Sequence, residues 1–190
     1  MAAVYQARLS LDRPGQYFIL TLTRADGSMF GATGKIRVKR QELPPAVGEA
    51  PPEIQTDTLT GAGGNIEAID TRIPPDDMHG TNFADVVGKR PVALLFATPQ
   101  LCQTRVCGPV VDIAAQLKKT YGDRVEFIHQ EVYVDNEVKK GLRPPLRAFG
   151  LRTEPWLFTF DRQGRVAARL EGSFGLDASR RAVEAALDAG

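Results

Sequence analysis

The run Pro91-Val-Ala-Leu-Leu-Phe-Ala97 is continuous and apolar, and it leads directly into the two cysteines of the chain, Cys102 and Cys107. Its short length and its bounding proline are typical of a strand that is buried on both faces of a parallel sheet. After the cysteines, residues 110–117 place their apolar side chains at helical spacing. The two thiols are therefore predicted where a buried strand gives way to a helix, at the sheet edge where α/β proteins place their sites.

Two thiols at the start of a helix are candidates for redox chemistry. Free backbone N–H groups and the helix dipole favour a thiolate there. Cys102 is expected in a polar, exposed turn near Arg105, which makes it the predicted nucleophile, and the deeper Cys107 is the predicted resolving thiol. Five helical positions separate two side chains by about 140°, so a bridge requires Cys102 to lie in the loop or the first turn to unwind. An inert structural disulfide and two unrelated buried thiols stay open as alternatives.

Length, charge and composition narrow the class of protein. A chain of 190 residues with 43% hydrophobic content can bury a full core in one or two domains. Its 24 basic and 23 acidic side chains nearly cancel, so no nucleic-acid partner is expected. No signal peptide and no membrane span is visible, although a chain that opens directly into a strand pattern is compatible with a longer precursor.

Three segments are expected along the chain. Residues 1–40 are predicted to form strands over residues 5–11, 17–22 and 35–39, with a hairpin turn at Ala25-Asp-Gly-Ser28. These strands resemble the closing strands of an immunoglobulin-like bacterial sandwich, and a β-extension packed on the main domain is the alternative. Residues 41–64 are rich in proline and glycine and are predicted to be an extended linker, and residues 65–190 form the main domain.

Strands and helices alternate from Pro91 onward, which predicts an α/β domain with a parallel or mixed sheet. Before it, Thr81 is the predicted N-cap of a short helix. Pro144 and Pro145 are expected to interrupt any helix between residues 136 and 150. The other expected elements are a strand over residues 125–134, a hairpin over residues 156–170 and a helix over residues 176–187.

Residues 65 to 187 resemble the thioredoxin superfamily. The resemblance rests on the apolar strand into Phe96, the cysteine-bearing helix start, and the run Phe149-Gly-Leu-Arg-Thr-Glu-Pro155-Trp-Leu-Phe-Thr-Phe-Asp-Arg-Gln-Gly164. It implies a thioredoxin-like fold, with a central mixed sheet flanked by helices, after an N-terminal β-strand extension. It also implies a cis Glu154–Pro155 bond facing the disulfide. An ordinary proline at a strand start is the alternative.

The chain departs from the pattern of this superfamily in three ways. Four residues separate the cysteines instead of two, Pro99-Gln-Leu replaces the usual Trp before Cys102, and the charged Glu154 precedes the proline. The wider spacing predicts a flexible bridge, and Glu154 is expected to tune substrate choice or to raise the cysteine pKa.

The predicted function is thiol–disulfide exchange on protein or small-molecule thiols. Cys102 would attack, Cys107 would resolve the mixed disulfide, and Pro155 would position the partner chain. No cofactor is expected, an extracytoplasmic or cell-envelope location follows from the resemblance, and the oligomeric state stays open. Asp112 and Glu154 are candidates for proton transfer. The predicted substrate contacts are Thr98, Pro99, Glu154 and Trp156.

Other functions compete with disulfide exchange. Thr98-Pro99 before Cys102, with a second cysteine five residues on, is similar to atypical two-cysteine peroxiredoxins, which have antioxidant activity. Those enzymes need an arginine at about the position of Pro155, and Arg152 lies three residues early. A non-enzymatic interaction module with a structural disulfide is a further alternative. For both the enzyme and the interaction module, Trp156 and Phe158 are predicted either to form an exposed apolar lip or to belong to the core.

Metal binding is the third class, because thioredoxin-like copper chaperones pair two thiolates with a distant histidine. The chain has only two histidines, His79 and His129, and neither lies between Pro155 and the last strand. His129 is predicted to be a hydrogen-bonded sheet residue. His79 is predicted to lie in a loop beside a solvated acidic run, Asp76-Asp77. No metal site is therefore expected.

Overall fold

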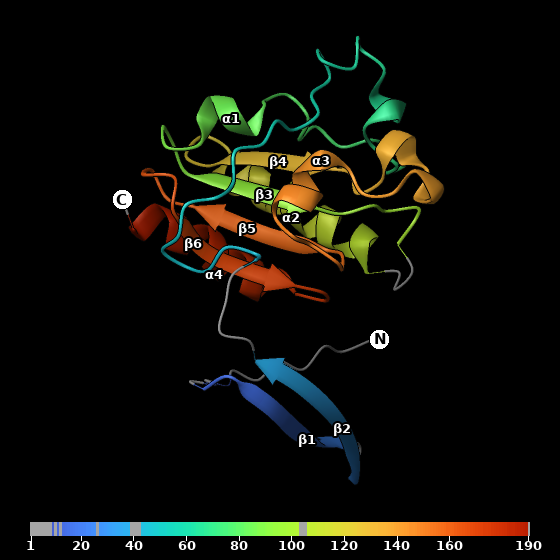
Figure 1. The fold of residues 1–190 in the computed structure, drawn as a ribbon, viewed down its shortest axis with the longest axis vertical. Coiled ribbons are helices and arrows are strands. Elements are labelled where there is room, and N and C mark those ends of the chain that lie inside the picture. Colours follow the sequence, from blue (N-terminus) through green and yellow to red (C-terminus); the bar gives the residue numbers. More distant parts are fainter. Residues whose placement is uncertain are drawn as a thin grey trace. The chain divides into compact units, whose positions relative to one another are not determined.

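The computed structural model describes residues 9, 11, 13–25, 27–38, 43–102 and 106–189. The chain divides into two compact units, residues 1–42 and residues 43–190. Figure 1 labels the helices and strands of both. The described residues of the first unit form a β-hairpin, and the second unit contains an α/β fold that holds both cysteines.

The hairpin consists of β1 (Gly15–Ala25) and β2 (Ser28–Val38), which pair antiparallel from Gly15 opposite Val38 to Ala25 opposite Ser28. Gly27 in the turn has a φ of 79°, a left-handed conformation that glycine adopts without steric cost. The predicted turn is thus confirmed. Of the strand expected at residues 35–39, residues 35–38 are the end of β2, and residue 39 lies outside the described residues. The strand expected at residues 5–11 falls largely outside the described residues, apart from Leu9 and Leu11, which belong to no strand.

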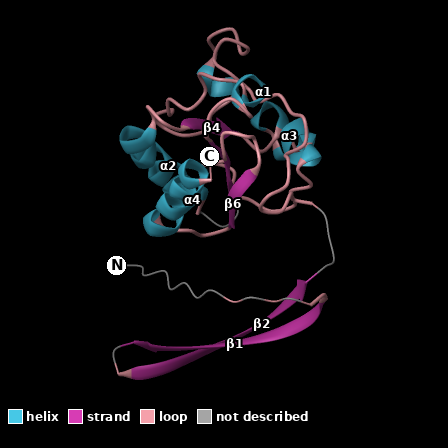
Figure 2. Cartoon of the chain, turned by 90° about the vertical axis from the view of Figure 1, so that its left-hand side faces the viewer, coloured by secondary structure: helices cyan, strands magenta, loops and turns pink. Residues whose placement is uncertain are grey.

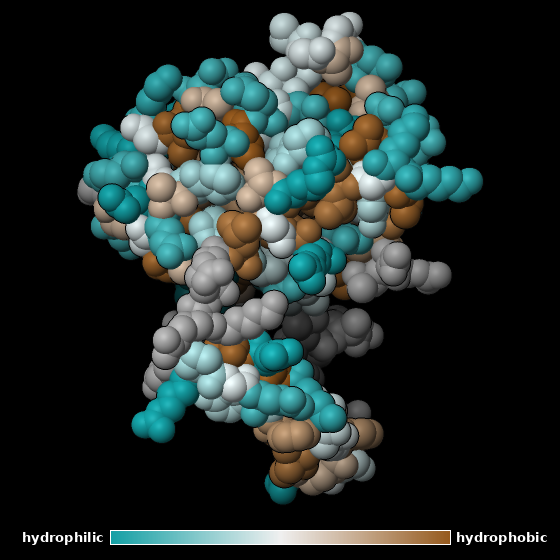
Figure 3. All heavy atoms as spheres, in the orientation of Figure 1, coloured by the Kyte–Doolittle hydropathy of each residue, from teal (hydrophilic) through white to brown (hydrophobic). Residues whose placement is uncertain are grey.

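Two strands cannot bury their own apolar side chains. Phe18, Leu20, Leu22 and Phe30 each expose 60% or more of their surface, and apolar side chains are visible on the hairpin in Figure 3. The described part of the first unit is therefore a hairpin without a core. The resemblance to an immunoglobulin-like sandwich is not confirmed.

The second unit is built on a mixed four-stranded sheet in the order β4-β3-β5-β6. β3 (Val92–Phe96) pairs parallel to β4 (Glu126–Gln130) and antiparallel to β5 (Trp156–Phe160), and β5 pairs antiparallel to β6 (Val166–Glu171). All five residues of β3 are buried, as expected for a strand that is covered on both faces. The predicted central mixed sheet is confirmed.

Helices cover both faces of this sheet (Figure 2). α2 (Cys107–Tyr121) and α4 (Leu176–Asp188) share one apolar cluster with Ala93 and Leu95 of β3. α1 (Phe83–Val86) and α3 (Pro144–Ala148) belong to a second cluster, with alternate β3 residues on the opposite face. Three short 3-10 helices complete the unit: η1 (Ile66–Ala68), η2 (Val134–Asn136) and η3 (Val138–Lys140). Within the described part of the chain, no helix has the length and apolar character needed to cross a bilayer.

Several local expectations need correction. Pro144 and Pro145 do not interrupt a helix but begin α3, where a missing backbone N–H removes no helical hydrogen bond. The N-cap of α1 is Asn82 rather than Thr81, because the Asn82 side chain accepts a hydrogen bond from the Ala84 N–H. The helix expected after the cysteines is as predicted, since α2 begins at Cys107.

Residues 43–64, which the composition predicts as a linker, belong to the second unit. The Gly48 N–H donates to the Val166 carbonyl at 2.8 Å, and the Val166 N–H donates to the Glu49 carbonyl at 2.9 Å. Ile54 and Thr56 are buried. The two backbone hydrogen bonds place residues 48–49 beside Val166, at the start of the edge strand β6.

The aromatic core between the sheet, α1 and α3 yields a stability prediction. The Phe158 side chain is fully buried and contacts four other rings, with centroid distances from 5.1 to 6.3 Å. Phe158→Ala should lower the free energy of unfolding by about 3–5 kcal/mol, because it leaves a cavity that the sheet cannot close. Val138→Ala, at a side chain that is 50% exposed, is the control and should change it by less than about 0.5 kcal/mol. Urea denaturation followed by circular dichroism measures both, and equal effects would contradict this packing.

Candidate active site

Cys102 and Cys107 form a disulfide, with their Cα atoms 6.0 Å apart. This separation lies within the usual range for a bridge. Cys107 is the first residue of α2, and Cys102 lies in the loop that follows β3. Of the two expected ways to bridge, with Cys102 in the loop or with an unwound first turn, the structure has the first. Arg105, expected to add positive potential, lies outside the described residues.

The two cysteines differ in exposure. Cys107 is fully buried, and Cys102 is 9% exposed. The expected order of depth is correct, but the exposed turn predicted for Cys102 is wrong. Cys102 belongs to the same apolar cluster as Met78 and Val110, and its bond to the start of α2 draws it against that cluster. Only Cys102 therefore offers surface to an attacking group.

Strand pairing places Pro155 at the same edge of the sheet as the loop that carries Cys102. β5 begins at Trp156, directly after Pro155, and Trp156 pairs with Phe96, the last residue of β3. Pro155 is buried, its carbonyl accepts a hydrogen bond from the Gly172 N–H at 2.8 Å, and the Glu154–Pro155 peptide bond is cis. The structure thus brings this proline and the disulfide loop to neighbouring strand ends.

Two further candidates lie in the loop itself. Thr98 is fully buried, and its hydroxyl has no hydrogen-bond partner among the described residues. Pro99 is half-buried beside it. Burying a hydroxyl without a partner costs free energy, and among the described residues of the loop Thr98 has such a hydroxyl.

The two remaining candidates, Glu154 and Asp112, differ in how far their side chains are buried. Glu154 is half-buried, and burial raises the pKa of its carboxyl group. Asp112 is exposed and forms an ion pair with Arg72 at 2.8 Å.

Trp156 and Phe158 do not form an exposed lip. Trp156 is 7% exposed and Phe158 is fully buried, and their rings stack with centroids 5.5 Å apart. The Trp156 indole N–H donates to the Thr153 hydroxyl at 3.0 Å, which satisfies its only polar group. Both side chains belong to the core. They lie two positions apart on β5, on the same face, and both are part of one buried apolar cluster.

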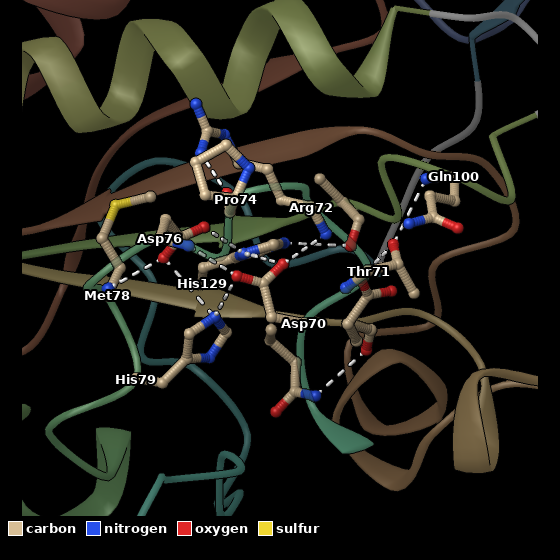
Figure 4. Close-up of polar contacts among 12 residues, drawn as sticks. Asp70, Thr71, Arg72, Pro74, Asp76, Met78, His79, Gln100 and His129 are labelled. Carbon is tan, nitrogen blue, oxygen red and sulfur yellow. Dashed lines mark hydrogen bonds and ion pairs between the residues drawn. The ribbon is translucent and has the colours of Figure 1, made fainter. Parts of the chain in front are cut away.

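Sequence reasoning missed a buried group of four side chains, here called the His–Asp cluster: Asp70, Asp76, His79 and His129 (Figure 4). The side chains of all four expose 2% of their surface or less. The prediction that His79 lies beside a solvated acidic run is wrong for Asp76, whose carboxylate accepts the Met78 N–H at 2.8 Å. The one signal for this cluster is the clustering of Asp70, Asp76 and His79 within ten residues.

His129 is hydrogen-bonded, as predicted. Its Nδ1 lies 2.8 Å from Asp76 Oδ2, and its Nε2 lies 3.2 Å from the Ala97 carbonyl oxygen. Burial opposes the charged imidazolium, but the hydrogen bond and charge of Asp76 outweigh it and raise the pKa of His129 to about 9. Burial likewise opposes the Asp76 carboxylate, yet His129 lowers the pKa of Asp76 to about 2. The two side chains therefore form a buried ion pair.

The His–Asp cluster adjoins the disulfide loop. His129 contacts the carbonyl of Ala97, the residue after β3, as described above. The Gln100 N–H donates to the Thr71 hydroxyl at 3.2 Å, and Thr71 follows Asp70 directly. Contacts at both Ala97 and Gln100 thus connect the cluster to the segment that leads to Cys102.

Comparison with known proteins establishes the fold. No protein-family model and no curated protein matches the sequence. Among solved structures, a putative thiol:disulfide interchange protein DsbE from Chlorobium tepidum is 17% identical, with a TM-score of 0.52 over 75% of this chain and 98% of that one. A thioredoxin family thiol:disulfide interchange protein from Chlorobium tepidum TLS is 18% identical, with a TM-score of 0.50 and the same coverage. The second unit of this chain therefore has a thioredoxin-like fold.

The half-buried Glu154 yields a pH prediction. Because its pKa is raised, the folded chain binds this proton more tightly than the unfolded chain. The resulting stability is present below the unfolded pKa of about 4.3 and is lost as the pH rises through the folded pKa. Glutamine has no charge to bury, so the stability of Glu154→Gln relative to wild type should increase from acid to neutral pH.

Denaturant midpoints at several pH values measure this effect. Glu67→Gln, at an exposed glutamate, controls for the loss of one negative charge. A constant difference between Glu154→Gln and wild type across the acid range would show that Glu154 is not desolvated.

Proposed function

We propose that this chain is a thiol–disulfide oxidoreductase that works through the Cys102–Cys107 couple. The observation that carries the proposal is a disulfide between the first residue of α2 and the loop after the central strand of a thioredoxin-like sheet. The names of the two similar Chlorobium tepidum structures, both thiol:disulfide interchange proteins, support it.

In the oxidising direction, a substrate thiolate attacks the Cys102 sulfur. The Cys102–Cys107 bond breaks, a mixed disulfide forms, and Cys107 leaves as a thiolate beside the N–H groups of the first turn of α2. A second substrate thiolate then displaces Cys102, so the substrate gains a disulfide and the couple takes up two electrons. In the reducing direction the Cys102 thiolate attacks the substrate disulfide, and Cys107 resolves the intermediate.

The exposure of the two cysteines supports this division of roles. Cys107 is fully buried and Cys102 retains 9% exposure, so an incoming thiolate meets Cys102 first. Reduction breaks the covalent link between Cys102 and the first residue of α2. We therefore propose the local rearrangement between redox forms that the spacing predicts.

The neighbouring residues would position the substrate. A peptide chain would align beside Pro155, with Pro99 at the rim of the loop and Glu154 favouring or excluding charged partners. Thr98, which is fully buried, would act through the position of the loop rather than by touching the substrate. Trp156, whose ring is buried, would act by holding the start of β5 against Thr153. We propose protein or small-molecule thiols as partners and an extracytoplasmic location, where a disulfide persists.

A structural disulfide is the second candidate, and the low exposure of Cys102 favours it. A bridge of that kind would staple the loop after β3 to α2 without turning over. Its reduction potential would lie below about −300 mV, beyond the reach of the glutathione pool.

Serine variants at the two cysteines test the enzymatic proposal. Cys102→Ser should reduce insulin-reductase activity to background, because no exposed nucleophile remains. Cys107→Ser should accumulate a mixed disulfide with substrate at Cys102, because the resolving thiol is gone. Activity is measured by insulin turbidity, and the adduct by mass spectrometry, with wild type and the double serine variant as controls.

Redox titration of the wild type with thiol trapping completes the test. A midpoint potential above about −300 mV supports exchange with cellular thiols. A lower potential together with full activity in Cys102→Ser would show that the bridge is only a structural disulfide.

A further inference from the structure

The His–Asp cluster brings its ligand atoms together in the interior. One ligand atom from each of Asp70, Asp76, His79 and His129 lies within 4.8 Å of the other three. The residues come from two parts of the chain, the segment that contains residues 70–79 and the strand β4. Figure 4 shows the side chains converging from these two segments. Such a convergence of imidazole and carboxylate groups needs a physical explanation, because buried polar groups are costly unless they are paired.

Internal hydrogen bonds account for part of the cluster. His129 is paired with Asp76 and with the Ala97 carbonyl, as described above. Asp70 Oδ1 accepts the Arg72 N–H, and Asp70 Oδ2 accepts the Asp76 N–H, both at 2.7 Å. A purely hydrogen-bonded structural network would explain these three side chains.

His79 is not explained in this way. It is 2% exposed, and neither of its ring nitrogens has a hydrogen-bond partner among the described residues. Leaving such a group buried and unsatisfied costs about 1–3 kcal/mol per polar atom. Its Nε2 nevertheless faces the carboxylates, 3.4 Å from Asp70 Oδ2 and 3.4 Å from Asp76 Oδ1. The imidazole is aimed into the cluster at ion-pair distance from both carboxylates, without the geometry of a regular hydrogen bond.

The spacing matches the edge of a metal coordination tetrahedron. Nitrogen and oxygen ligands bind Zn²⁺ at about 2.0–2.2 Å, so two ligand atoms of one tetrahedral site lie about 3.3–3.6 Å apart. Both His79 contacts have this length. The Nδ1 of His129 lies 2.8 Å from Asp76 Oδ2 and 4.0 Å from Asp70 Oδ1, so small shifts would bring all four groups to one ion.

The surrounding contacts resemble the outer shell of a metal site. Metal-binding histidines commonly donate their second ring nitrogen to a backbone carbonyl, and ligating carboxylates are themselves hydrogen-bonded. His129 has this arrangement, since its Nε2 faces the Ala97 carbonyl while its Nδ1 faces the cluster. The backbone N–H groups of Arg72, Asp76 and Met78 fix the two carboxylates.

We propose that Asp70, Asp76, His79 and His129 bind one divalent first-row transition-metal ion of the zinc type. Two imidazoles and two carboxylates suit Zn²⁺ better than Ca²⁺ or Mg²⁺, which prefer oxygen ligands alone, and better than Cu(I), which prefers sulfur. Four buried protein ligands leave no open position, as in structural rather than catalytic zinc sites. The ion would fasten residues 70–79 to β4 beside the loop of Cys102. This proposal departs from the expectation that the chain has no metal site, and it does not depend on the proposed redox function.

Zinc binding is tested on the full chain in which Cys102→Ser and Cys107→Ser remove competing thiolates. After treatment with a chelator, the protein is titrated with Zn²⁺ against a chromophoric competitor, and its melting temperature is recorded with and without Zn²⁺. One ion should bind per chain and raise the melting temperature. Loss of outer-shell groups weakens metal sites 10–100-fold, so His79→Gln and Asp70→Asn should weaken binding by more than about 100-fold.

A matched control is available at Asp77, whose side chain is 78% exposed and lies next to Asp76 in the sequence. Asp77→Asn should leave the zinc affinity unchanged. Absence of stoichiometric binding, or an unchanged affinity in both ligand variants, would overturn the proposal.

Histidine NMR keeps the test decisive if the ligand variants fail to fold. The chain contains only His79 and His129, so each contributes one set of ring signals. Addition of Zn²⁺ should shift the ring nitrogen signals of both histidines and produce a slowly exchanging bound form. Signals that stay unchanged at saturating Zn²⁺ would overturn the proposal without any substitution.

Discussion

Burial of β3 on both faces is the constraint on which the rest of this structure depends. Its five residues are all buried, alternating between the cluster shared with α2 and α4 and the cluster shared with α1 and α3. Because both faces of β3 are packed, the position of its C-terminal end is fixed. Its end sets the position of the Cys102 loop, of Pro155 through the pairing of Phe96 with Trp156, and of His129 through the Ala97 carbonyl. The disulfide and the His–Asp cluster are therefore two features of one sheet edge.

At that edge, the disulfide and the His–Asp cluster hold different parts of the loop after β3. The disulfide joins the loop to α2 on one side. The His–Asp cluster holds the beginning of the same loop through Ala97, and Thr71 holds Gln100. Reduction would release only the first of these attachments. The proposed metal site would then keep the start of the loop in place while Cys102 moves to meet a substrate.

The sequence predicts the elements that short-range patterns encode. The apolar run before Ala97 is a buried strand, the residues after Cys107 are helical, and the hairpin after Pro155 is present, because each is specified by its own periodicity and turn residues. Helix geometry also limits a bridged Cys102 to two places, the loop or an unwound first turn, and the structure has the first. These features need no knowledge of distant contacts.

Long-range contacts decide what the sequence could not predict. The burial of Cys102 depends on a cluster that includes Met78, which lies 24 residues earlier in the sequence. His79 and Asp76 read as a solvated loop because their partner His129 lies on β4, and only the fold brings them together. The proline-rich residues 43–64 read as a linker for the same reason, since their hydrogen bonds to Val166 cross most of the chain.

The central claim is that Cys102 is the sulfur that exchanges with substrates. The most direct measurement is to treat the oxidised protein briefly with glutathione, quench with acid, and map the adduct by peptide mass spectrometry. Our account predicts glutathione on Cys102 and a free thiol on Cys107. An adduct on Cys107 would contradict it. So would a Cys102–Cys107 disulfide that stays intact under conditions in which glutathione itself is kept reduced.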